Sequence, residues 1–237
     1  MAQEIFETLR PSTGAFVQSA YRLWPIVDGH FLRDQAGQVL TRGEHNHVPT
    51  MGGSNANEVG LWRAQSWRPT LRALHQTEGS WLLAYEAALL GVYFRADKVA
   101  RIVAQYPLAE DTEAATVPTL ERVITDSNFV CSTRRYARAL AEVEPKTWLY
   151  RFSRNPIAAG PASLGAFHGL EMQYLFGNHD ADHGALFAES PTPDDEALSA
   201  AMMGYWTRFA ATGDPNGPGT VTWPAYHAGG DAKTTLE

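Results

Sequence analysis

The stretch VPTMGGSNANEVGLW, residues 48–62, contains the change of pattern that decides the fold. Residues 48–53 are typical of a short strand that enters a Gly-rich turn, and the polar residues that follow indicate a loop over 54–60. Glu58 lies in this loop, just beyond the expected strand. In open α/β sheets, the loops at the carboxyl ends of parallel strands are where sites are built.

Working outward, residues 61–141 have a helical pattern that is expected to break at Pro69, Gly79, Pro107 and Pro118. The segment TWLYRF, residues 147–152, is rich in aromatic and β-forming residues and predicts a second strand. The order of elements is therefore strand, several helices, strand. This order indicates an α/β fold with few sheet strands and a large helical excursion.

The clearest helix is expected late in the chain. Thr192 with Asp195 three residues on forms a capping-box pattern, Pro193 suits the first helical position, and Gly213 ends the helix. Residues 233–236 are expected to begin a further strand. No linker divides these elements, so we expect a single partial domain over residues 1–237.

Composition limits the function. The chain has 237 residues, 44% of them hydrophobic, and a formal net charge of −7 with scattered basic residues. These values are ordinary for a globular protein and give no basic footprint for nucleic acid. No run of 18 apolar residues exists, so no membrane span is expected. The single cysteine, Cys131, excludes an internal disulfide.

A second informative stretch, GAFHGLEMQYLFGN at residues 165–178, contains His168 in an apolar neighbourhood. Such a histidine is usually packed in a core, and a minority are catalytic bases on a loop. Like Glu58, His168 follows an expected strand through a loop. If the two strands are parallel neighbours, both loops lie on one rim of the sheet and the two side chains meet within hydrogen-bond distance.

The residues of several segments together resemble the type-B carboxylesterase/cholinesterase family. The segments are WPIVDG, VPTMGGSNANEVGLW, DSNFVC, LGAFHGLEMQYLFG, YWTRFAATGDPN and WPAY, in that order. The resemblance implies part of an α/β-hydrolase fold and a serine esterase that forms an acyl-enzyme. It makes Glu58 the acid and His168 the general base of a catalytic triad. Asp126 resembles a carboxylate that the family keeps near the triad, although a simply solvated aspartate explains it equally well. Leu61 and Trp62 occupy positions that line the acyl pocket in relatives, although ordinary core packing explains them as well.

The family's nucleophile lies in a Gly-x-Ser-x-Gly turn, and no serine of this chain has glycine at both positions. The resemblance therefore implies the C-terminal half of a carboxylesterase domain whose N-terminal nucleophile half is absent. We expect the isolated chain to be inactive on its small-molecule carboxylic ester substrate and to need that missing half. It is expected to use no metal or organic cofactor. The compartment stays unknown, cytoplasmic or secreted from a bacterium, because a signal peptide would precede the missing half.

Four alternatives remain open at this point. The chain could be a non-catalytic, cholinesterase-like adhesion or interaction domain, although a binding module has no need of Glu58 and His168. It could also be a truncated, poorly folded product with no activity of its own. Cys131 could replace the serine, but a small buried residue is favoured because nothing cationic adjoins it. Residues 179–183, HDADH, and 44–47, EHNH, faintly resemble metal ligand sets, and for the former a solvated loop is favoured.

Overall fold

The computed structural model describes residues 26–92, 95–155, 164–178, 191–227 and 234–236. The chain divides into two compact units, one containing Val59–Asp126 and the other containing Trp24–Glu58 and Ser127–Glu237. The first unit is helical within its described residues, and the second contains the sheet. The expectation of a single partial domain stays a prediction.

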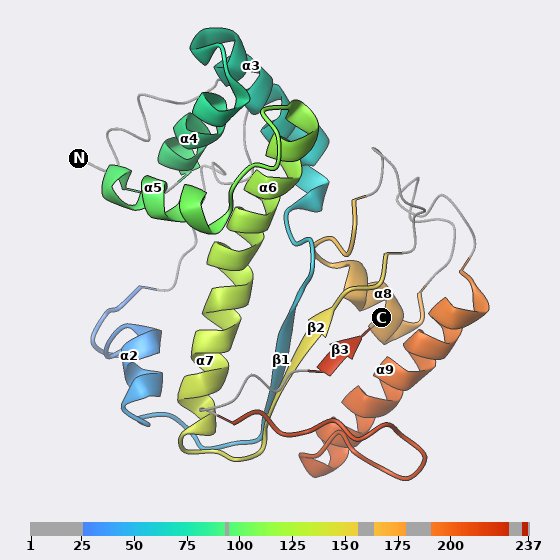
Figure 1. Cartoon of the computed structure of the whole chain (residues 1–237). Coiled ribbons are helices and arrows are strands. Elements are labelled where there is room, and N and C mark those ends of the chain that lie inside the picture. The colour runs from blue at the N-terminus through green and yellow to red at the C-terminus, as the bar shows by residue number, and fades with distance from the viewer. Residues whose placement is uncertain (1–25, 93–94, 156–163, 179–190, 228–233, 237) are drawn as a thin grey trace. The chain divides into compact units, whose positions relative to one another are not determined.

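The sheet has three parallel strands in the order β1 (Thr50–Asn55), β2 (Thr147–Phe152) and β3 (Thr234–Leu236) (Figure 1). The 147–152 prediction is confirmed, as is a strand within 233–236. The first strand lies two residues later than expected. Its pairing begins at Thr50, whose N–H donates to Lys146 O at 2.9 Å, because Pro49 has no N–H to offer.

The two faces of β2 pack against different helices. Leu149 packs with Ala137 of α7 (Cys131–Ala141), whereas Trp148 packs with Tyr205 of α9 (Pro193–Thr212). Successive side chains of a strand point to opposite faces, so the sheet is covered on both sides. Figure 1 shows α7 and α9 on opposite sides of the strands. This layering is that of an α/β fold.

Helix α9 has the termini that its sequence predicts. The Thr192 hydroxyl accepts from the Asp195 N–H, the Asp195 carboxylate accepts from the Thr192 N–H, and Pro193 occupies the first turn. Gly213 ends the helix in the left-handed conformation, with φ of 72°. The capping box thus satisfies N–H groups that a helix start otherwise leaves without partners.

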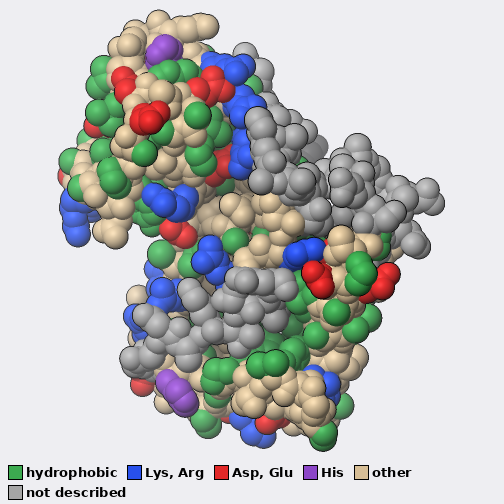
Figure 2. Space-filling view, turned by 45° about the vertical axis from the view of Figure 1, so that its right-hand side comes forward, with side chains coloured by type: hydrophobic (Ala, Val, Ile, Leu, Met, Phe, Trp, Pro, Cys, Tyr) green, Lys and Arg blue, Asp and Glu red, His purple; other side chains and the backbone are tan. Residues whose placement is uncertain are grey.

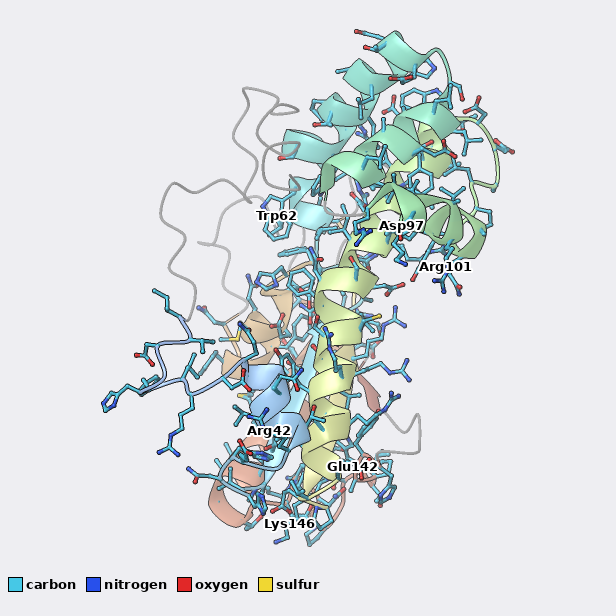
Figure 3. The ribbon with its side chains drawn as sticks, turned by 90° about the vertical axis from the view of Figure 1, so that its left-hand side faces the viewer. Arg42, Trp62, Asp97, Arg101, Glu142 and Lys146 are labelled. Atoms are coloured by element: carbon cyan, nitrogen blue, oxygen red, sulfur yellow. The ribbon has the colours of Figure 1, made fainter. Side chains whose placement is uncertain are left out.

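The second unit contains two shorter helices. Helix α2 (Ala36–Thr41) lies along α7, as Figure 3 shows, and Arg42 directly after it pairs with Asp34 at 2.9 Å. Helix α8 (Leu170–Phe176) packs against α9 and begins two residues after His168. A π-helical turn, η4 (Asp126–Val130), precedes α7.

The helical unit contains, in chain order, η2 (Gly60–Trp62), η3 (Arg63–Trp67), α3 (Arg68–Glu78), α4 (Trp81–Val92), α5 (Ala96–Gln105) and α6 (Glu113–Thr125). The expected breaks at Gly79 and Pro107 are confirmed, and Pro69 lies in the first turn of α3. The break expected at Pro118 is wrong, because Pro118 lies inside α6.

Helix α6 tolerates Pro118 because its packing outweighs one missing backbone hydrogen bond. Val117 and Leu120 on either side of the proline are buried, and Glu121 forms a two-bond ion pair with Arg63, with both N–O distances at 2.7 Å. Proline in a helix interior removes one N–H donor and crowds the preceding turn. Tertiary contacts of this kind routinely override such local preferences.

One face of the molecule shows side chains of several kinds. On the face shown in Figure 2, hydrophobic, acidic and basic side chains are interspersed. Phe176 and Met172 of α8 are 68% and 47% exposed, as isolated apolar residues on protein surfaces commonly are. Among the described residues, the helices are all too short or too polar to cross a bilayer.

Candidate active site

Glu58 and His168 meet beyond the carboxyl ends of β1 and β2. The Glu58 Oε2 atom lies 2.7 Å from His168 Nδ1, so the contact expected from the sequence is present. Oε1 accepts a hydrogen bond of 2.7 Å from the Asn55 N–H, at the last residue of β1. Both oxygens of the carboxylate are therefore held by the protein.

Backbone pairing aligns the two loops that carry these residues. The Asn57 N–H donates to Ala166 O at 3.0 Å, and the His168 N–H donates to Glu58 O at 3.2 Å. The Asn57 Oδ1 atom accepts from the Ala166 N–H at 3.2 Å. Gly165 has φ of 65°, and a Cβ there would clash with the side chain of Asn57, so this position requires glycine.

Asn55 also contacts the His168 loop through its side chain. Its Nδ2 atom donates to the carbonyl oxygen of Phe167 at 2.8 Å and to a carboxylate oxygen of Glu171. Asn55 is 1% exposed, and its backbone is fixed in β1 opposite Phe152. One buried residue therefore links the Glu58 carboxylate to the backbone next to His168.

The carboxyl group of Glu58 has a pKa above its ordinary value. Burial is the main cause, since the side chain is only 6% exposed. Hydrogen bonds from the Asn55 N–H and His168 lower the pKa, and the negative charge of Glu171 raises it again. The site thus contains a buried carboxylate whose partners only partly compensate its charge.

The imidazole of His168 is much more accessible than the carboxylate, because its side chain is 50% exposed. One side of the ring lies against Phe129, with ring centroids 5.4 Å apart. The expectation that a core histidine would be buried does not fit this exposure. The arrangement is a half-exposed imidazole whose Nδ1 atom contacts a buried carboxylate.

Known proteins of one family are similar to this chain over most of its length. The model of the Carboxylesterase family matches residues 1–237. The chain belongs to the carboxylesterase family. Similar proteins include Carboxylesterase 5A of Canis lupus familiaris, 28% identical over 85% of this chain, and the medium-chain fatty acyl-CoA hydrolase precursor of Anas platyrhynchos, 29% identical over 94%. The chain covers 35% and 41% of the length of these two relatives.

A solved structure, a PNB esterase, has the same fold over this region. The TM-score is 0.65 at 24% identity, over 90% of this chain and 39% of the esterase chain. The fold is therefore part of an α/β-hydrolase, as the sequence predicts.

Other predicted site residues of this carboxylesterase-family chain lie in the helical unit. The Asp126 carboxylate accepts a hydrogen bond of 2.9 Å from the Tyr106 hydroxyl, so it is tied to the protein rather than simply solvated. Leu61 and Trp62 belong to η2 and are partly exposed. Their roles as supporting carboxylate and substrate-binding residues stay predictions.

The structure bears on the two alternative chemistries, a cysteine nucleophile and a metal site. Cys131 is exposed at the start of α7, so the expectation of a buried cysteine is wrong; Phe129 and Val130, just before it, are the partly buried residues. Residues 179–183 lie outside the described part of the chain. Within the described ranges, no group of three or more His, Cys, Asp or Glu is placed to hold a metal ion. His47 of the 44–47 cluster instead contacts Gly43 O at 3.1 Å.

Sequence reasoning missed two residues of this site, Asn55 and Glu171. Each lies three residues from a member of the pair, Asn55 before Glu58 and Glu171 after His168, but this spacing alone does not mark either residue as a partner. The contact between them joins residues 116 positions apart and depends on the pairing of β1 with β2.

Proposed function

We propose that this chain supplies the acid, Glu58, and the base, His168, of a carboxylic ester hydrolase that works through an acyl-enzyme on serine. The observation that carries the proposal is the 2.7 Å contact between a buried carboxylate and a half-exposed imidazole. Membership of the carboxylesterase family supports the reaction class. The substrate is a small carboxylic ester.

In the proposed reaction, the His168 imidazole accepts the proton of a serine hydroxyl as its oxygen attacks the ester carbonyl. The imidazolium then returns the proton to the leaving alcohol, and water releases the acid by the same sequence of proton transfers. Glu58 holds Nδ1–H, which fixes the tautomer, and stabilises the imidazolium when it forms. Its incompletely compensated charge suits this role, because the imidazolium supplies the missing positive partner.

The proposed reaction requires a serine and oxyanion-stabilising N–H groups from outside these 237 residues. Within them, the serine closest to the family's turn is Ser54, which has Gly52 before it but Ala56 after it. Ser54 also lies inside β1, rather than on a turn between strand and helix. The 237-residue chain alone is therefore expected to hydrolyse no aryl ester through a covalent intermediate.

The test joins this chain behind an N-terminal carboxylesterase segment that carries the Gly-x-Ser-x-Gly turn, and measures hydrolysis of a short aryl ester. His168→Ala is expected to lower kcat by about 10⁴-fold or more, and Glu58→Ala by about 10³–10⁴-fold. Matched controls are His227→Ala and Glu142→Ala, at exposed positions of the same unit, and they should leave kcat unchanged (Glu142 is labelled in Figure 3).

Full activity of the fused protein after loss of either Glu58 or His168 would refute the proposal and favour a non-catalytic interaction domain. A second measurement keeps the proposal testable if the fusion does not fold. In the 237-residue chain itself, proton NMR should show a far-downfield His168 Nδ1–H resonance that Glu58→Gln weakens or abolishes. Its absence from the folded chain would also count against the proposal.

A further inference from the structure

We infer that Asn55 is a positioning residue that sets the geometry of Glu58 and His168 together, by holding the carboxylate with its backbone N–H and the His168 loop with its side-chain amide. The inference rests on the proposed function, since it concerns the alignment of the proposed acid and base. Asn55 is placed to do this because it ends β1 and is buried.

The backbone of Asn55 is a rigid point of reference. It pairs with Phe152 at the last position of the β1–β2 ladder, and the next residue, Ala56, donates to Phe152 O at 2.8 Å. From this fixed position the Asn55 N–H donates to Glu58 Oε1 at 2.7 Å. The other carboxylate oxygen, Oε2, is thereby directed at His168 Nδ1.

The side chain of Asn55 acts on the other partner. A primary amide has two N–H donors, and both have acceptors here: Phe167 O at 2.8 Å and the Glu171 carboxylate. Phe167 directly precedes His168, and Glu171 follows it in the first turn of α8. The amide therefore holds the His168 turn on both sides.

The chemistry requires the donors of an amide at this position. Phe167 O and the Glu171 carboxylate are both acceptors, so aspartate, which has the shape of asparagine, would offer no hydrogen bond to either. It would also bring a third negative charge next to Glu58 and Glu171. Small displacements of an acid–base pair lower a rate strongly, since about 1 Å of misplacement can reduce it about 10²-fold.

The experiment compares Asn55→Asp with Asn216→Asp in the full 237-residue chain. Asn216 is a matched control, because its Nδ2 atom likewise donates to a carboxylate oxygen and a backbone carbonyl, those of Asp214 and Trp223. The readout is the far-downfield Nδ1–H resonance of His168, with the midpoint of urea unfolding measured in parallel. We expect both variants to lower the midpoint, and only Asn55→Asp to lose the resonance.

Asn55→Ala serves if the aspartate variant does not fold, because it removes both donors without adding charge. It should broaden or shift the resonance in the 237-residue chain. In the fused enzyme it should lower kcat by roughly 10–100-fold with little change in KM. A wild-type resonance in the folded Asn55 variants, or an equal loss in Asn216→Asp, would overturn the inference. Failure of the proposed function gives a different result, because in that case His168→Ala would leave the kcat of the fused enzyme unchanged.

Discussion

Two buried carboxylates of the sheet-containing unit are held in opposite ways. The side chains of Glu58 and Asp195 are 6% and 4% exposed, so water compensates neither charge. Asp195 accepts from Arg154 Nε and the Tyr174 hydroxyl, both at 2.7 Å, and from the N–H and hydroxyl of Thr192. Glu58 accepts from one backbone N–H and from His168, with a second carboxylate nearby.

The pKa values of the two groups follow from these partners. Burial alone would raise the pKa of both carboxyls. At Asp195 the hydrogen bonds from Arg154, Thr192 and Tyr174 outweigh burial and hold the pKa well below its usual range. At Glu58 burial prevails and the pKa is raised. The contacts of Asp195 thus stabilise its charged form, whereas the contacts of Glu58 leave part of its charge uncompensated.

The largest effect should come from removing the well-compensated carboxylate. Asp195→Ala would leave Arg154 without its buried partner and would remove the carboxylate half of the capping box of α9, so the free energy of unfolding in urea should fall by about 3–5 kcal/mol. Asp194→Ala is the control, because Asp194 is exposed in the same helical turn, and its effect should stay within about 0.5 kcal/mol. Equal effects of the two substitutions would mean that the ion pair and hydrogen bonds of Asp195 contribute little to stability.

A smaller effect should follow from removing a single partner of Asp195. Tyr174→Phe deletes the hydroxyl that donates to Oδ1 but keeps the ring, which packs on Phe152 with centroids 5.1 Å apart. Loss of a hydrogen bond to a charged group should lower the free energy of unfolding by about 1.5–3 kcal/mol. Tyr136→Phe, at an exposed tyrosine of α7, is the control and should change little. If Tyr174→Phe leaves the free energy of unfolding unchanged, Arg154 and Thr192 alone are enough to stabilise the buried charge of Asp195.

The same two carboxylates show how far sequence reasoning reaches. The contact between Thr192 and Asp195 spans three residues and could be predicted, because a capping box is a local pattern. Arg154 and Tyr174 could not be assigned to Asp195, since they lie 41 and 21 positions away and arrive only when β2 and α8 pack near the start of α9. Likewise, the resemblance pointed to Glu58 and His168, but only the pairing of two loops reveals Asn55 between them.

Failures of the sequence predictions have the same origin. Pro118 was expected to end a helix because its local chemistry disfavours one, and the buried contacts of α6 reverse that preference. Cys131 was expected inside because its neighbours are apolar, yet its position on α7 leaves it at the surface. In both cases the local sequence does not contain the tertiary contacts that decide the outcome.

The smallest predicted effect is the change in stability when Glu58 is made neutral. Its sign is opposite to that of the change expected at Asp195. Because the folded-state pKa of Glu58 is raised, protonation favours the fold: this contribution is fully present below the unfolded pKa, near 4.3, and is lost as pH rises through the folded value. Glu58→Gln remains neutral throughout. We therefore expect it to match the stability of the wild type in acid and to exceed it at neutral pH.

Urea unfolding of the wild type and Glu58→Gln between pH 4 and pH 7 measures this difference directly. Asp195→Asn is the contrasting variant. The lowered pKa of Asp195 gives stability that is present above the pKa of the unfolded state and is lost as pH falls through the pKa of the folded state. Asp195→Asn should therefore be less stable than the wild type by the largest amount at neutral pH, and the difference in the free energy of unfolding should shrink in acid. A Glu58→Gln variant that is less stable than the wild type at neutral pH would show that the hydrogen bonds from Asn55 and His168 compensate the buried charge in full. The distinction between the two carboxylates would then be lost.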